Sequence, residues 1–113
     1  MKDWNFENIV AETTGKWNAE LSKLQVETTD TVAKRIFYTA LYHAFMQPIM
    51  FNDCSGEYRG TDKNIYGDPG FTNYTVFSLW DTYRAAHPLL TYTEPVRTND
   101  MIKSFLAFYD QNG

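Results

Sequence analysis

Mostly apolar residues recur every three or four positions along the first part of the chain, which is the spacing of an amphipathic helix. The pattern predicts a helix over about residues 4–24, with Asp3 as its N-cap. Gly15 weakens the middle of this helix without ending it. The positions that form the stripe are Phe6, Ile9, Val10, Thr13, Trp17, Leu21 and Leu24.

A second helix is predicted over about residues 31–47, capped by Thr29 or Asp30 and ended by Pro48. Apolar residues form one stripe, and Tyr38, Tyr42 and Met46 occupy much of the opposite side. A helix that is apolar or aromatic nearly all round is a buried one. Such a helix would be unusual in a lone domain of 113 residues, whereas it is expected for an inner helix of a helical barrel.

The periodicity breaks over about residues 51–77, where glycine, proline, asparagine and aspartate are frequent. We expect a hairpin turn at Asp53–Gly56 with residues 58–60 on its return arm, and a short strand over about 72–77. A connection of this length is typical of functional loops and lids. Helical spacing then resumes and predicts helices over about 80–91 and 97–111, the second capped by Thr98 or Asn99.

Composition restricts the class of protein. The 3 Trp, 8 Tyr and 8 Phe are more rings than a domain of 113 residues covers easily, so we expect some to face a partner or a ligand. A net charge of −4 argues against binding to a nucleic-acid backbone, and no apolar run approaches the ~20 residues of a membrane span. A single cysteine, Cys54, excludes an internal disulfide.

Trp80 and Asp81 form the pair best suited to binding a sugar. An indole can stack on a pyranose, and a neighbouring carboxylate can accept two of its hydroxyls in charge-assisted hydrogen bonds. The simpler interpretation is a core Trp beside an Asp that caps the third helix. Arg84, three residues later, would either orient the carboxylate or form a helix ion pair.

Neither a metal site nor a catalytic pair can be derived from the residues alone. The run from Asp62 to Asp68 has the alternating oxygens of a calcium loop, but its twelfth position is Asn73, where the pattern requires Glu. Glycosidases use two carboxylates, about 5–5.5 Å apart for retention or about 6.5–9.5 Å for inversion. Several carboxylates are available here, and the sequence does not indicate which two would converge.

Several strings of the chain resemble, in order, the calcium-dependent exo-α-mannosidases of glycoside hydrolase family 92. The strings cover nearly the whole chain: Trp4-x-Phe6, Trp17-Asn18-x-x-Leu21, Phe37 to His43, Asp53-x-x-Gly56-x-Tyr58-Arg59-Gly60-x-Asp62, Tyr74 to Asp81, Arg84, and His87-Pro88-Leu89-Leu90. Cys54-Ser55 departs from the usual pattern of the hairpin turn. The resemblance implies a mainly α fold, namely a fragment of an (α/α)6 toroid with a small β-hairpin insertion, treated as one segment over residues 1–113.

The resemblance also implies a function for the whole enzyme: inverting, calcium-dependent removal of terminal α-linked mannose, in many members α-1,2-linked, from glycans. Trp80 and Asp81 would line the wall of the mannose subsite, with Arg59 and Asp62 near it. The general acid, the base and most calcium ligands would lie past Gly113, so we expect no catalytic and no metal-ligating residue in this segment. Relatives are typically exported by bacteria to the periplasm or cell surface. The isolated segment is expected to be inactive and to self-associate.

Two alternatives remain at this point. The first is a stand-alone helical module that binds carbohydrate or protein without catalysis, which would explain the aromatics and the missing catalytic pair. The second is a small independent enzyme acting through Asp81 and Asp62.

Overall fold

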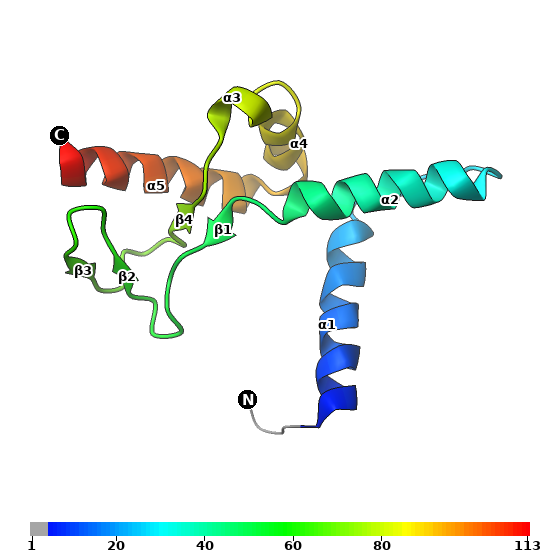
Figure 1. Ribbon diagram of the computed structural model, residues 1–113, viewed down its shortest axis with the longest axis horizontal. Coiled ribbons are helices and arrows are strands. Elements are labelled where there is room, and N and C mark those ends of the chain that lie inside the picture. The colour runs from blue at the N-terminus through cyan, green and yellow to red at the C-terminus, as the bar shows by residue number, and fades with distance from the viewer. Residues whose placement is uncertain (1–4) are drawn as a thin grey trace. The chain divides into compact units, whose positions relative to one another are not determined.

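The computed structural model describes residues 5–113, which divide into two compact units, residues 5–44 and residues 45–113 (Figure 1). Asp3, the predicted cap of the first helix, lies outside the described residues, as does Trp4. Five helices and four strands of two residues each make up the described chain. The predicted fold class, mainly α with a small β insertion, is confirmed.

The first unit contains helix α1 (Phe6–Leu21) and nearly all of helix α2 (Thr31–Phe45). The carboxamide of Asn5 caps α1 by accepting the backbone N–H of Glu7 at 3.0 Å. The helix ends three residues earlier than the periodicity predicts, because Ser22 forms its C-cap and its hydroxyl donates to the Ala19 carbonyl at 2.8 Å.

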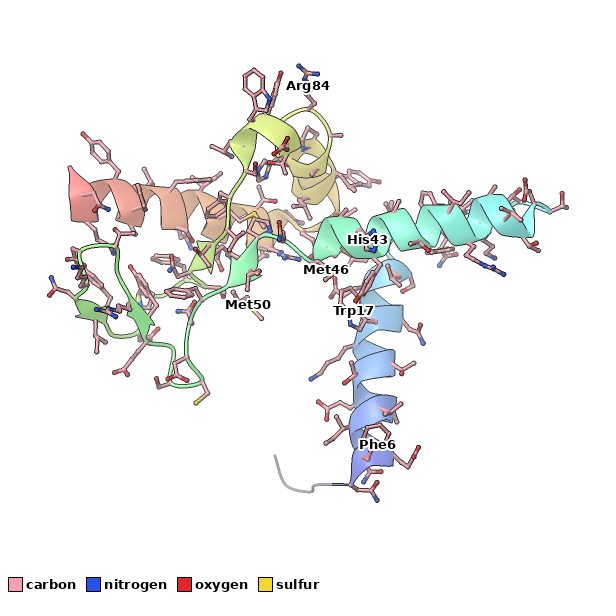
Figure 2. The ribbon with its side chains drawn as sticks, viewed as in Figure 1. Phe6, Trp17, His43, Met46, Met50 and Arg84 are labelled. Atoms are coloured by element: carbon pink, nitrogen blue, oxygen red, sulfur yellow. The ribbon has the colours of Figure 1, made fainter. Side chains whose placement is uncertain are left out.

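Asp30 caps α2 by accepting the N–H groups of Val32 and Ala33 at 2.9 and 3.0 Å. Aromatic contacts then fix α1 against α2. The rings of Trp17 and Tyr42 lie 4.5 Å apart, near His43 in Figure 2.

The first half of α2 is not covered within the described chain. The side chains of Val32 and Ile36 are 63% and 65% exposed, whereas Leu41 and Phe45 near the end of the helix are buried. Within the described chain, therefore, α2 is not buried nearly all round: Leu41 and Phe45 are its buried residues, and His43 between them is exposed. Its exposed apolar positions are one turn apart, so they form a continuous stripe.

The second unit begins with two small antiparallel ladders. Strand β1 (Ile49–Met50) pairs with β4 (Tyr74–Thr75), and β2 (Tyr58–Arg59) pairs with β3 (Ile65–Tyr66). The predicted turn forms, since the Gly56 N–H donates to the Asp53 carbonyl at 2.9 Å. The Asp53 N–H also donates back across this turn to the Glu57 carbonyl at 2.7 Å. Residues 58 and 59 of the return arm then pair forward with β3, through a connection at residues 60–64.

Three helices complete the second unit: α3 (Leu79–Thr82), α4 (Ala86–Thr93) and α5 (Pro95–Asn112). The predicted helix over 80–91 is therefore two helices. Pro88 explains the break, because proline is tolerated in a first turn but not in a helix interior, and α4 begins two residues before it. Pro95 likewise starts α5, so the predicted caps Thr98 and Asn99 lie inside that helix.

The core of the second unit joins β4 to α5. Ser104 on α5 is 4% exposed, and its hydroxyl accepts the Tyr74 N–H at 2.9 Å while it donates to the Asp100 carbonyl at 2.8 Å. The Arg97 guanidinium donates to the carbonyl of Pro48 at 2.9 Å and lies over the Tyr74 ring. Buried with them are Tyr58, Leu90 and Met101.

No helix in the described part of the chain is long and apolar enough to cross a membrane.

Gly60 is expected to tolerate no side chain. A Cβ at this position would lie 2.6 Å from Asp62 Oδ1 and from Cε2 of Tyr66, whose ring is stacked on Tyr58. Gly60→Ala should therefore destabilise the second unit by roughly 1–3 kcal/mol, measured by urea unfolding. Gly67→Ala is the matched control, because its Cβ would meet nothing within 4 Å. Equal effects of the two substitutions would show that this close approach does not matter.

Candidate substrate-binding site

Trp80 and Asp81 lie in the first turn of α3, directly after the extended segment that leaves β4. The indole of Trp80 is 83% exposed, so it is not part of the core formed by the described residues. The Ser78 hydroxyl donates to Asp81 Oδ2 at 2.5 Å and holds the carboxylate in place. The other carboxylate oxygen has no partner among the residues described. An exposed ring beside an oriented acceptor is the arrangement that a sugar requires.

Arg84 does not pair with Asp81. Its Nε donates to the Tyr83 hydroxyl at 2.7 Å, and its guanidinium lies 5.3 Å from the centre of the Tyr83 ring. Figure 2 shows Arg84 projecting away from the ribbon. The Asp81 carboxylate is therefore oriented by Ser78 and not by a cation on the same helix.

Arg59 and Asp62 lie on the other candidate element, the β2–β3 hairpin. Asp62 accepts hydrogen bonds from the Tyr66 hydroxyl at 2.8 Å, from the Asn64 carboxamide at 2.7 Å and from the Asn64 N–H at 3.0 Å. These donors, the Tyr66 hydroxyl above all, lower the pKa of the Asp62 carboxyl. The same bond raises the pKa of the Tyr66 hydroxyl. Asp62 thus organises its own turn, whereas the Arg59 guanidinium has no partner within the described residues.

The structure brings Arg59 and Asp62 together but does not bring them to Trp80 and Asp81. Figure 1 shows α3 and the β2–β3 hairpin on opposite sides of α5. Arg59 instead borders an aromatic hollow of about 460 Å³ between the strands and the second half of α5. Asn73 and Gln111 also line this hollow. The sequence did not indicate either residue as part of a binding site, and Asn73 drew notice as the position where the calcium-loop pattern fails.

The described residues do not fit a complete calcium site. No group of three or more His, Cys, Asp or Glu side chains gathers closely enough among them to hold a metal ion. Both carboxylate oxygens of Asp62, at the start of the predicted calcium-like loop, already accept hydrogen bonds from Asn64 and Tyr66. We therefore assign calcium ligation to no residue of this part of the chain.

Comparison with known proteins places this chain in a family of glycosidases. The family model of the glycosyl hydrolase family 92 catalytic domain matches residues 1–113. The chain belongs to this family. No curated protein sequence gives a significant match.

Solved structures agree with this assignment. The family GH92 α-mannosidase BT3965 from Bacteroides thetaiotaomicron is 43% identical, with a TM-score of 0.90 over 96% of this chain. Its complex with mannoimidazole gives a TM-score of 0.91 at the same identity. The GH92 glycosyl hydrolase ccman5 is 31% identical, with a TM-score of 0.86.

These matches also define the extent of the likeness. The match covers 96% of this chain but only 15% of the Bacteroides enzyme, so the chain spans a small part of that protein's length. The predicted identity as a segment of a helical toroid is confirmed.

We predict that Tyr66→Phe raises the pKa of Asp62. The substitution removes the hydroxyl that contributes most to lowering this pKa and keeps the ring. A folded-state pKa below the unfolded value stabilises the fold at higher pH, and this contribution is lost as pH falls through the folded pKa. The variant should thus lose part of the acid sensitivity of the hairpin. Carboxyl-carbon NMR titration measures the shift, and an unchanged Asp62 pKa would contradict the assignment.

Proposed function

We propose that this chain forms part of the substrate-binding wall of an exo-acting α-mannosidase. The observation that carries the proposal is the exposed Trp80 indole beside Asp81, whose carboxylate is held by Ser78 and keeps one oxygen unpartnered. In the proposed site the indole stacks on the C–H face of a terminal mannose. The Asp81 carboxylate accepts two of its hydroxyls, as a fixed anion does with strength and direction.

We further infer that Arg59 and Asp62 act near the same glycan, with Arg59 contributing a free cation and Asp62 shaping the hairpin that carries it. Asp62 itself is a positioning residue in this proposal, because its oxygens are occupied. The basis for placing this hairpin near the mannose is the family resemblance.

The reaction proposed for the whole enzyme is the hydrolysis of terminal α-linked mannose with inversion, and α-1,2 is the proposed linkage. Inversion needs an acid and a base about 6.5–9.5 Å apart, with a water between the base and the sugar. We assign neither to this chain, and we propose that both, together with the calcium ligands, lie elsewhere in the catalytic domain. The resemblance also supports export to the periplasm or surface of a bacterium.

A chimera tests the role of Asp81. This chain replaces the matching segment of the Bacteroides α-mannosidase, with which it shares 43% identity. Asp81→Asn should then lower kcat/KM on α-1,2-mannobiose by about 10- to 100-fold, because hydrogen bonds to a charged group are worth roughly 1.5–3 kcal/mol. Asp110→Asn, at another exposed carboxylate, is the matched control and should change little.

The proposal for Asp81 is contradicted if both Asp→Asn variants of an active chimera retain the parent kcat/KM. Circular dichroism and thermal unfolding check that neither substitution disturbs the fold. Trp80→Ala adds an independent readout, since loss of the stacking face should raise KM.

We also propose that the isolated chain self-associates. Large apolar side chains are exposed on α1, α2, α4 and α5, and contiguous apolar patches above a few hundred Å² mark interaction surfaces or aggregation. Val32 and Ile36 form such a stripe on α2, and Val96 on α5 is 76% exposed.

Sedimentation velocity should therefore show a mass that rises with concentration. Val32→Lys with Ile36→Lys should shift the distribution toward monomer, because it places charges in the apolar stripe. Gln25→Lys with Thr29→Lys adds the same two charges at exposed polar positions outside the stripe and serves as the control. A monomeric chain at every concentration would contradict the proposal.

A further inference from the structure

The aromatic hollow of the second unit has the features of a small-molecule site. Its volume of about 460 Å³ falls within the range of about 300–1,000 Å³ for ligand pockets. Strands β2 and β4 supply Tyr58 and Tyr74, and α5 supplies Phe105 and Phe108. Such sites are mostly apolar and contain a few polar groups that fix the orientation of the ligand.

Asn73 supplies the polar group that makes this hollow more than an apolar surface. The residue is only 9% exposed, and it lines the hollow. Its backbone is fully engaged, with the N–H donating to Asn52 Oδ1 at 2.5 Å and the carbonyl accepting the Phe51 N–H at 2.8 Å. Its carboxamide has no hydrogen-bond partner among the described residues. The carboxamide atoms are not among the fully buried unpaired polar atoms of the described chain, so they are accessible and can bind a ligand in the hollow.

The polar groups of the hollow restrict the chemistry of its occupant. A purely apolar occupant would exclude water from the Asn73 carboxamide and leave its donor and acceptor unsatisfied, which is unfavourable. A small, fully polar ligand would leave the aromatic walls without an apolar partner. A pyranose offers both surfaces, because its C–H face can lie against rings while neighbouring hydroxyls exchange hydrogen bonds with an amide.

Arg59 extends the polar side of the hollow. Its guanidinium has no partner in the described chain, and it borders the hollow. It offers donors only, whereas the Asn73 carboxamide offers a carbonyl oxygen and an NH₂ group. Together they match hydroxyls in both hydrogen-bonding roles.

We propose that this hollow is a second saccharide subsite, which binds a pyranose unit of the glycan through Asn73, Arg59 and the aromatic walls. The proposal rests on the proposed function, because a mannose-containing glycan is the substrate in that function. The subsite is separate from the Trp80–Asp81 pair, which does not line the hollow.

Ligand-observed saturation-transfer NMR on the 113-residue chain tests this subsite with methyl α-mannopyranoside. The method does not require a monomeric protein. We expect transfer to the ring protons of the sugar from the aromatic walls. Asn73→Ala should weaken the apparent affinity by about fivefold, as expected for the loss of one or two hydrogen bonds. The carboxamide has no partner to lose, so the thermal unfolding midpoint should stay unchanged.

Matched variants separate the two sites. Asn99→Ala removes the carboxamide of an exposed residue on α5 and should leave the affinity unchanged. Absence of saturation transfer overturns the proposal, and so does transfer that is lost with Trp80→Ala but retained with Asn73→Ala. Transfer to an apolar probe such as benzyl alcohol, without transfer to the mannoside, also overturns it, because the hollow would then be an apolar docking surface. The chimera result for Asp81 is independent of these outcomes.

Discussion

The contact between β4 and α5 is the constraint on which the rest of the second unit depends. Strands of two residues are too short to be stable alone, since even an isolated hairpin is marginal in water. The buried Ser104 hydroxyl ties the Tyr74 N–H to the α5 backbone, and Arg97 ties the end of α2 and Pro48 to the same helix. Burial raises the pKa of the Tyr74 hydroxyl, so its neutral form is the one that the core accommodates.

The contact between β4 and α5 positions both candidate binding elements. The chain leaves β4 at Thr75 and reaches Trp80 and Asp81 within six residues, so the start of α3 is positioned by the strand. The β2–β3 hairpin is attached to the C-terminal end of α5, where Gln111 accepts the Thr61 N–H at 3.2 Å and donates to the Tyr58 hydroxyl at 2.9 Å. A single helix thereby holds β4 near its middle, through Ser104, and the hairpin at its C-terminal end.

Periodicity predicted the helices well where the pattern is long and regular, as in α1, α2 and α5. It failed where a single residue decides the outcome. Pro88 divides the predicted third helix, because its ring is acceptable only in a first turn. The pairing of Tyr58 with Tyr66 could not be predicted either, since two-residue strands contain no alternation and the Asp62 hydrogen bonds that shape the connection depend on geometry.

The candidate site, like the fold, could be predicted from the sequence only in part. The exposed Trp80 beside Asp81 agrees with the sugar-binding interpretation made from residue types, and its assignment to mannose is part of the proposed function. The place of Asn73 in the hollow could not be identified in advance, because only the fold shows which side chains line it. The surroundings of a side chain follow from the fold and cannot be derived from the residue type alone.

We propose that this chain contributes binding surface but not the catalytic acid and base. Incubation of the isolated 113-residue chain with α-1,2-mannobiose and calcium, followed by quantification of free mannose, is the most direct test. We expect no release above the uncatalysed background, whereas the active chimera should release mannose under the same conditions. Mannose release by the isolated chain that disappears with Asp81→Asn or Asp62→Asn would show instead that catalytic groups lie within it.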